Sequence, residues 1–315
     1  MRERHQRVGD GPQRAAGDRI IRTADPRSLL DADLLIDFFD RYGRDLPWRD
    51  PAATPWAVLV SEVMLQQTPV VRVLPVFFEW LARWPAPADL AADSPAAAIR
   101  AWGRLGYPRR ALRLHAAATV ITTEHGGAVP GSVDALLALP GIGHYTASAV
   151  TAFAFGARTA VVDTNVRRVL TRAARGVDEP REGATGADRA EMLTLLPAEP
   201  ARAVRFSAAV MELGALVCTA RAPACGSCPL AGGCRWRLAG SVVGLPRRAA
   251  QDWHGTDRQV RGRVMAALRR SPGPLPVVAF GDPSLDPEQT ARCLASLLAD
   301  GLVVRVGATN LGLPD

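Results

Sequence analysis

The sequence contains no lysine. All 38 of its basic residues are arginine, and they outnumber the 31 acidic residues, so the formal net charge is +7 and the isoelectric point is about 9.9. A Schiff base requires a primary amine, so the missing lysine excludes lysine-based covalent catalysis by a side chain. The excess of positive charge fits a polyanionic partner such as a nucleic acid.

Long apolar runs are also missing. Although 48% of the 315 residues are hydrophobic, none of the runs approaches the roughly 20 residues that span a bilayer. The N-terminus lacks the apolar segment of a signal peptide, and residues 1–27 are polar, arginine-rich and aperiodic, which predicts a disordered tail. We therefore expect a cytoplasmic protein that does not associate with membranes.

Cysteine is scarce but clustered. Four of the five cysteines follow the spacing C-x6-C-x2-C-x5-C: Cys218, Cys225, Cys228 and Cys234. Such a cluster in a cytosolic chain indicates a metal site and not disulfides. Zinc sites usually show two close pairs, whereas only one C-x2-C pair occurs here, so the spacing favours an iron–sulfur cluster. The fifth, Cys293, falls in an apolar segment and is expected in a core.

The most informative stretch covers residues 132–165. A short amphipathic helix capped by Ser132 is predicted to stop at Pro140, and a second helix to run from about 144 to 155. Between them, Gly141 and Gly143 suit a turn that needs unusual φ values or a close backbone approach. The turn feeds a helix N-terminus, which favours an anion such as a phosphate. This is the pattern of a helix-hairpin-helix.

Two carboxyl groups stand out as candidates for acid and base chemistry. Glu62 lies in a helix that begins at Thr54 and Pro55 and is otherwise almost wholly apolar, so burial should raise its pKa and make it a general acid. The alternative is a buried Glu that pairs with an Arg. Asp163 follows the hairpin and is a candidate anion, or it simply caps a helix over 166–175 that ends at Gly176.

The rest of the chain reads as helical, which makes the expected fold class all-α. Helices are predicted over 28–42, capped by Ser28, over 70–84, within 95–125, and over 187–196 and 201–217, with 85–95 as an Ala/Pro-rich connection and 178–186 as a loop. We expect one large domain over 28–239 and a linker over 240–256. The remainder, 257–315, is predicted as a small winged-helix-like module with helices over 257–270 and up to 299, and strands near 302–306 and 310–313.

Several segments in order and spacing resemble one family. They are LPWR, SEVMLQQTPV, LGYPRRALRLH, LPGIGHYTASAV, VVDTNVRRV and MELGALVC, followed by the cysteine spacing. From about residue 30 to 237 the chain resembles the MutY-type adenine DNA glycosylases of the helix-hairpin-helix, or endonuclease III, superfamily. The resemblance implies a six-helix barrel with an iron–sulfur cluster domain, and a [4Fe–4S] cluster on the four clustered cysteines.

The resemblance also implies roles for particular residues. Glu62 would protonate a flipped adenine and later activate water, Asp163 would stabilise the cationic sugar, and Tyr145 and Asn165 would support them. Trp48 and Arg49 would line the base pocket. The positions implied for DNA contact are Gln66, Gln67, Thr68, Tyr107, Gly141, Gly143 and Arg221.

The implied substrate is double-stranded DNA with adenine opposite 8-oxoguanine or guanine. Bifunctional glycosylase/lyases of the superfamily carry Lys where this chain has Tyr145, so we expect a monofunctional enzyme without β-lyase activity. About 75 residues follow Gly240, too few for the Nudix-like domain of full-length relatives, and Ala208 and Pro108 also depart from the family pattern. We expect a monomer associated with the nucleoid.

Two rival functions remain open at this point. One is a T/G or U/G mismatch glycosylase of the same superfamily, and the QQT sequence after Glu62 argues against it. The other is a noncatalytic iron–sulfur DNA-binding protein, for which substitution of Glu62 and Asp163 would leave DNA binding and biological effect unchanged.

Overall fold

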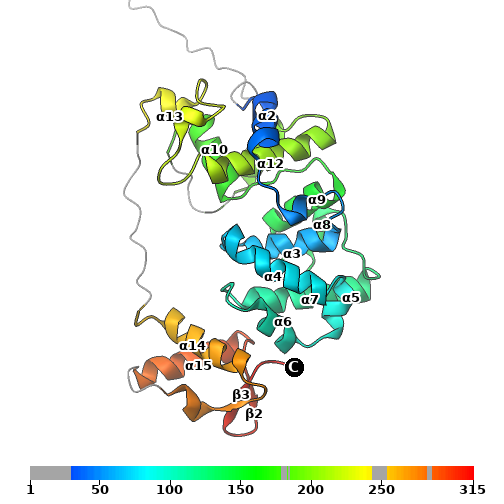
Figure 1. The fold of residues 1–315 in the computed structure, drawn as a ribbon, viewed down its shortest axis with the longest axis vertical. Helices are drawn as coiled ribbons and strands as arrows, with labels where there is room; N and C mark the ends of the chain where they lie inside the picture. Colours follow the sequence, from blue (N-terminus) through cyan, green and yellow to red (C-terminus); the bar gives the residue numbers. More distant parts are fainter. Residues whose placement is uncertain (1–29, 179–182, 184, 243–253, 282–285) are drawn as a thin grey trace, which may run out of the picture.

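The computed structural model describes residues 30–178, 183, 185–242, 254–281 and 286–315. The predicted tail 1–27, Ser28 and most of the predicted linker lie outside these residues. Helices dominate, and they form three packed groups that follow one another along the longest axis of the molecule (Figure 1). None of the helices in the described ranges is both long and apolar enough to cross a bilayer.

The middle group consists of a short 3-10 helix and helices α3 to α9. They are η1 (Pro47–Arg49), α3 (Pro55–Leu65), α4 (Val70–Arg83), α5 (Pro87–Ala92), α6 (Pro95–Trp102), α7 (Arg109–Glu124), α8 (Val133–Leu137) and α9 (His144–Phe155). Their shared core contains three tryptophans packed edge to face, Trp80, Trp84 and Trp102. The segment 85–95, predicted as a plain connection, contains α5, because a proline at the first helical position and Asp89 on the Ala86 N–H start a turn of helix there.

The second group joins the start of the described chain to its later helices. It comprises α2 (Ala32–Tyr42), α10 (Thr164–Ala173), α11 (Gly186–Leu195), α12 (Pro200–Leu216), η2 (Cys225–Ser227) and α13 (Arg235–Leu238). The apolar face of α2 packs against α12 in one core with α10. Helix α2 is capped by Asp31 instead of the predicted Ser28, since the Asp31 carboxylate accepts from two free N–H groups of the first turn.

The third group is the C-terminal module. It contains α14 (Asp257–Arg270), η3 (Val277–Phe280), α15 (Pro287–Ala299) and a small antiparallel sheet in the order β1-β3-β2, made of β1 (Leu275–Pro276), β3 (Asn310–Gly312) and β2 (Val304–Val306). The sequence predicted both helices and the last two strands, but it missed β1, which is only two residues long. Cys293 is buried as predicted. Ala96 and Ile99 of α6 belong to the module's core, so the module packs on the middle group.

Candidate active site and iron–sulfur site

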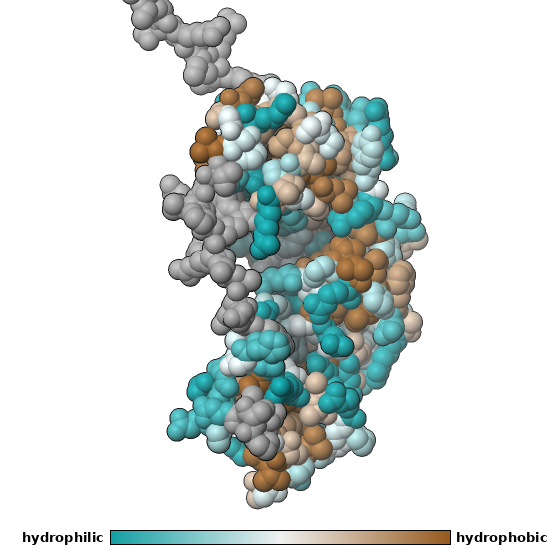
Figure 2. Space-filling view, turned by 60° about the vertical axis from the view of Figure 1, so that its left-hand side comes forward, coloured by the Kyte–Doolittle hydropathy of each residue, from teal (hydrophilic) through white to brown (hydrophobic). Residues whose placement is uncertain are grey.

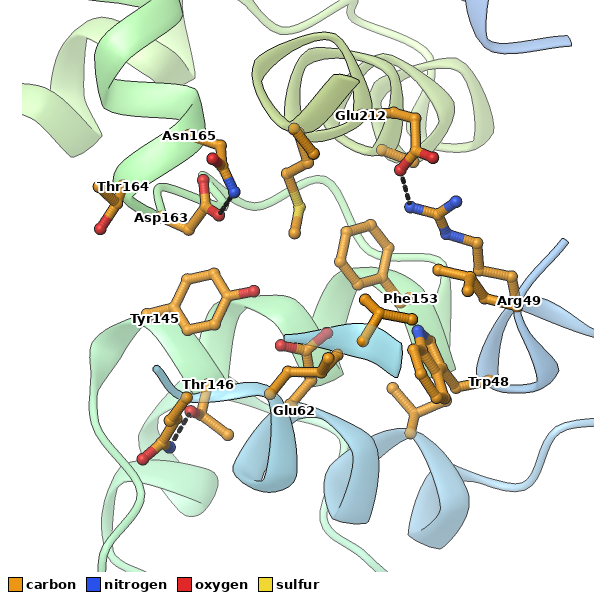
Figure 3. Close-up of a pocket in the computed structure, with 18 of the residues that line it drawn as sticks. Trp48, Arg49, Glu62, Tyr145, Thr146, Phe153, Asp163, Thr164, Asn165 and Glu212 are labelled. Atoms are coloured by element: carbon orange, nitrogen blue, oxygen red, sulfur yellow. Dashed lines mark hydrogen bonds and ion pairs between the residues drawn. The ribbon is translucent and has the colours of Figure 1, made fainter. Parts of the chain in front are cut away.

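A cleft of about 1280 Å³ lies where the first two groups meet. Its walls come from η1, α3 and α9 on one side, and from the start of α10 and from α12 on the other. Figure 2 shows this side of the molecule hollowed between its upper and middle parts. Both candidate carboxyl groups, Glu62 and Asp163, line this same cavity and lie on opposite walls of it (Figure 3). The cavity is large enough for a flipped purine.

Glu62 is buried because its helix is buried on nearly every side. Nine of the eleven residues of α3 are buried, and the Glu62 side chain is 4% exposed. One of its carboxyl oxygens, Oε2, has no hydrogen-bond partner, and within the described residues Glu62 forms no ion pair. Desolvation raises the pKa of Glu62 to about 7, a hydrogen bond with Tyr145 opposes the rise, and the negative charge of Asp163 adds to it. Glu62 is therefore about half protonated at pH 7 and mostly protonated below it.

Asp163 is only partly buried, and both of its oxygens accept hydrogen bonds. It is the N-cap of α10, and its Oδ1 accepts from the Val166 N–H at 2.6 Å while its Oδ2 accepts from Asn165 Nδ2 at 2.8 Å. Arg168 in turn donates to Asn165 Oδ1 at 2.7 Å. Burial raises the pKa of Asp163, and these donors oppose the rise. The capping interpretation is therefore confirmed, and the cap hydrogen bond is one of the interactions that favour the anion that the sequence predicts.

Close backbone packing holds Asn165 in place. A Cβ atom on Gly214 of α12 would come within 2.7 Å of the Asn165 Cβ. Arg168 also donates to the Gly214 carbonyl oxygen at 2.6 Å. The glycine in the MELGALVC segment thus lets α12 approach the start of α10 and fixes the side chain that supports Asp163.

Tyr145 lies between the two carboxyl groups. It comes from α9, and Figure 3 shows its hydroxyl directed into the cavity on the side of Glu62 and Asp163. Burial and both neighbouring carboxylates raise the pKa of Tyr145 well above its usual value. Its hydroxyl therefore stays protonated and is available as a hydrogen-bond donor to either carboxylate.

The cleft also contains a charged residue that the sequence did not single out. Glu212 of α12 is fully buried, and it accepts from Arg49 Nη2 at 2.8 Å and from Arg44 Nε at 2.6 Å. These arginines hold the pKa of Glu212 at about 2, so it is an anion. Arg49 thus pairs with Glu212 and not with Glu62, while Trp48 packs edge to face on Phe77 beside the cavity. A single acidic residue within the apolar run 206–217 was the available signal.

The residues at the end of α3 surround the mouth of the cleft. Gln66 Nε2 donates to Thr146 Oγ1 at 3.2 Å, and the buried Thr68 hydroxyl donates to the Leu105 carbonyl at 3.2 Å. Gln67 is exposed and has a φ of 56°. Tyr107 is also exposed, with a φ of 46°, but it is not part of the cavity wall.

The two hairpin glycines differ in their requirements. Gly141 has a φ of 78°, and a Cβ atom there would come within 2.6 Å of the Arg113 side chain, so only glycine fits without strain. Gly143 has an ordinary φ of −100°, contrary to the expectation of an unusual conformation, and no atom lies within 4 Å of its missing Cβ. Gly143 therefore leaves open space in front of the α9 N-terminus, where N–H groups are free to bind an anion.

The four clustered cysteines surround a second, small cavity away from the cleft, and Arg172, Trp236 and Val217 complete its wall. Desolvation raises the pKa of Cys218, against the effect of Arg172, and desolvation also raises that of Cys228 to about 11. Among the described residues no three His, Cys, Asp or Glu side chains are arranged around a single ion. Four thiols around one cavity fit the donor set of an iron–sulfur cluster. Arg221 is exposed on this loop, outside the cleft.

Known proteins resemble this chain over most of its length. The profile of the HhH-GPD superfamily of base excision DNA repair proteins matches residues 60–193, and that of the iron–sulfur binding domain of endonuclease III matches residues 218–234. An adenine DNA glycosylase of Mycolicibacterium smegmatis is 53% identical over 275 residues, which is 85% of this chain and 91% of that protein. One of Mycobacterium tuberculosis is 50% identical over 292 residues, 92% of this chain and 95% of that protein.

A solved structure extends the likeness to another branch. The structure of a thermostable thymine-DNA glycosylase superposes with a TM-score of 0.62 at 28% sequence identity, and the match covers 68% of this chain and 97% of that one. The part that it leaves uncovered is about the size of the C-terminal module together with the segments outside the described residues.

Proposed function

Since this chain belongs to the adenine DNA glycosylases of the HhH-GPD superfamily, we propose that it flips and removes adenine mispaired with 8-oxoguanine or guanine in double-stranded DNA. The observation that best supports this proposal is the pair of carboxyl groups in one cleft. Glu62 has a buried oxygen without a hydrogen-bond partner, whereas both oxygens of Asp163 accept hydrogen bonds. One acid is thereby kept protonated and the other kept ionised, as hydrolysis of a glycosidic bond requires.

The reaction begins with proton transfer from Glu62 to a ring nitrogen of the flipped adenine. The bond from the sugar C1′ to the base then breaks, and its electron pair leaves with the adenine. The Asp163 carboxylate stabilises the positive charge that develops on the sugar, held in position by Asn165 and the Val166 N–H. Water adds to C1′, and the Glu62 carboxylate takes its proton, which restores the starting state.

Other site residues bind the base and the DNA. Trp48 and Arg49 lie beside the cavity, where Arg49 is oriented by the buried Glu212 anion. Gln66, Gln67 and Thr68 at its mouth, together with Tyr107, contact the opened stack, while Gly141 and Gly143 hold phosphate through N–H groups at the hairpin. Flipping costs least at a mispaired base, which adds to selectivity.

The iron–sulfur domain serves the DNA surface. Cys218, Cys225, Cys228 and Cys234 hold the cluster, which we infer to be of the [4Fe–4S] type from the four-thiol set. When bound, the cluster would cross-link a loop that is otherwise built from short 3-10 and helical turns. Arg221 on that loop is exposed and can contact a DNA phosphate. We place the enzyme in the cytoplasm at the nucleoid, as a monomer.

The absence of lysine carries a separate proposal. Tyr145 lies at the start of α9. Its side chain is a phenol and not an amine, so it cannot form a Schiff base with the sugar. We therefore propose a monofunctional glycosylase that leaves an intact abasic site. Strand breaks that appear before alkali treatment would contradict this.

The test is base release from three duplexes with adenine opposite 8-oxoguanine, adenine opposite guanine, and thymine opposite guanine. Wild type should release adenine from the first two, and Asp163→Asn should lose at least about a thousandfold in rate while it keeps the α10 cap, since Asn also caps helices. Release of thymine alone would favour the thymine branch. DNA binding without any base release would favour the noncatalytic alternative.

A further inference from the structure

Two exposed residues near the cleft have backbone conformations that L residues rarely adopt. Gln67 and Tyr107 have φ values of 56° and 46°, and within the described residues Ser241 is the one other non-glycine residue with positive φ. Such conformations are strained, and they persist only where the surroundings fix them. Gln67 follows the end of α3, and Tyr107 lies in the loop between α6 and α7. Something must therefore hold both turns.

The Arg110 guanidinium binds the main chain of both turns. Its Nη1 donates to the carbonyl oxygen of Gln66 at 2.6 Å, directly before Gln67, and to that of Met64 at 2.9 Å. Its Nη2 donates to the carbonyl oxygen of Gly106 at 3.0 Å, directly before Tyr107, and to Thr68 Oγ1 at 2.9 Å. One side chain thus joins two segments that are about forty positions apart in the sequence.

The environment of Arg110 offers dipoles and rings instead of a carboxylate. The side chain is 7% exposed, and the described residues provide it with no ion pair. Its charge meets the carbonyl end of α3, where the helix dipole is negative, and it lies 5.1 Å from the Trp102 ring and 5.6 Å from the Tyr107 ring. A neutral side chain here would leave several buried acceptors without donors.

The C-terminal module also contacts the Tyr107 side chain. Arg258 Nη2 donates to the Tyr107 hydroxyl at 3.1 Å, and its guanidinium lies 5.6 Å from the ring centroid. The ring is therefore fixed at its hydroxyl by α14, while its backbone is fixed by Arg110. Arg110 thus joins the turn of Gln67, which lines the cleft, to the turn of Tyr107.

We propose that Arg110 is a positioning residue that holds the Gln67 and Tyr107 turns as one wedge, which opens the base stack and keeps the target adenine out of it. This inference rests on the proposed function, because it assigns the wedge to the flipping step. Arg110 does not line the cleft, so it acts through the two turns and not on the reacting atoms.

Arg100 provides a matched control. Its Nη1 donates to three main-chain carbonyls, those of Leu268, Arg269 and Ser271, and so it ties α6 to the C-terminal module by the same kind of bond. It does not line the cleft or contact either turn. The variants Arg110→Met and Arg100→Met therefore remove comparable hydrogen bonds at different places.

The experiment measures single-turnover adenine release from two duplexes. In one, adenine is paired with 8-oxoguanine, and in the other the same adenine faces a one-nucleotide gap and needs no unpairing. Arg110→Met should slow adenine release from the paired duplex at least about tenfold more than from the gapped duplex. The reason is that the wedge offsets the free energy of unpairing and unstacking the adenine, which is larger in the paired duplex. When 2-aminopurine replaces the target adenine, its fluorescence in the complex with Arg110→Met should be lower than in the complex with wild type, because less of it is flipped out of the stack. Arg100→Met should slow both duplexes by the same factor.

Arg110→Lys keeps the charge and three donors and should restore part of the paired-duplex rate. Equal slowing of both duplexes by Arg110→Met would overturn the inference, because that is the effect of general destabilisation. If Arg110→Met does not fold, the same ratio measured for Arg110→Lys decides, and an unchanged ratio overturns the inference. A wild type that releases no adenine would instead refute the proposed function, and the inference with it.

Discussion

At the residue scale, two carboxyl groups that line one cleft acquire different properties from their surroundings. Glu62 has an oxygen without a partner inside an apolar helix, whereas Asp163 accepts from a main-chain N–H and from Asn165. When the two groups share one proton, Glu62 is the group that binds it, because neutralising Glu62 weakens fewer hydrogen bonds to a carboxylate than neutralising Asp163 does. The proposed division between acid and anion therefore follows from the number of donors together with the deeper burial of Glu62.

The first prediction concerns the pH dependence of the rate. With the pKa of Glu62 at about 7, the protonated form is present below pH 7 and is lost above it. We expect the single-turnover rate of adenine release to fall about tenfold per pH unit above pH 8. Rates measured from pH 5.5 to 9.5 would check this, with DNA affinity followed in parallel as the control. A rate independent of pH up to pH 9 would contradict it.

The second prediction concerns stability. The folded state raises the pKa of Glu62 from 4.5 to about 7, so it binds this proton more tightly than the unfolded chain does. The corresponding stability is fully present below pH 4.5 and is lost as the pH rises through about 7. Glu62→Gln removes the ionisation, so at pH 8 the inactive variant should be more stable than wild type by about 3 kcal/mol. Urea unfolding at pH 8 and pH 5 would measure the difference, which should shrink at the lower pH.

At the element scale, the two glycines of the hairpin between α8 and α9 meet different requirements, one for backbone conformation and the other for open space. Gly141 is required by its positive φ and by its contact with Arg113, while Gly143 is required by neither. The open space before Gly143 lies at the N-terminus of a twelve-residue helix. We therefore expect the first glycine to serve folding and the second to serve the approach of a phosphate.

The third prediction uses these two glycines as a pair. Gly141→Ala should lose about 1 kcal/mol or more of stability and also weaken binding to undamaged duplex DNA. Gly143→Ala should keep its stability to within about 0.5 kcal/mol and still weaken binding, because the added methyl group occupies the phosphate position. Thermal unfolding and a binding titration at fixed salt would test both. Unchanged binding by Gly143→Ala would show that phosphate does not approach there.

At the scale of the whole molecule, the cleft exists because the chain returns on itself. Helix α2 packs against α12, so η1 and α3, which follow it, are brought opposite α10 and α12. The cysteine loop is anchored to the same second group, where Arg172 donates to the Thr219 carbonyl at 2.7 Å and lies 4.7 Å from the Trp236 ring. Loss of the cluster should therefore destabilise the second group of helices before the other two groups.

The fourth prediction compares two cysteines. Cys228→Ser should lower the iron and sulfide content per protein and weaken DNA binding, because the loop that carries Arg221 loses an anchor. Cys293→Ser, which alters the core of the C-terminal module, should keep full iron content. Metal analysis and DNA titration of the purified variants would check this. Full iron content in Cys228→Ser would remove that cysteine from the ligand set.

The sequence by itself determined the local features. Caps such as Thr54 and Ser132, the hairpin, the buried environment of Glu62 and both helices of the C-terminal module follow from short-range patterns, and the structure confirms them. The sequence missed α5 and β1, because weak, short elements are decided by their neighbours.

Only the tertiary structure decided which residues meet. It paired Arg49 with Glu212 and gave Glu62 no ion pair within the described residues. It also placed Asp163, 101 positions after Glu62 in the chain, in the same cavity. It also revealed that Arg110 joins two distant turns. Partners of this kind depend on how helices cross, which no periodicity along one helix records, since the pattern fixes which face is buried but not what it is buried against.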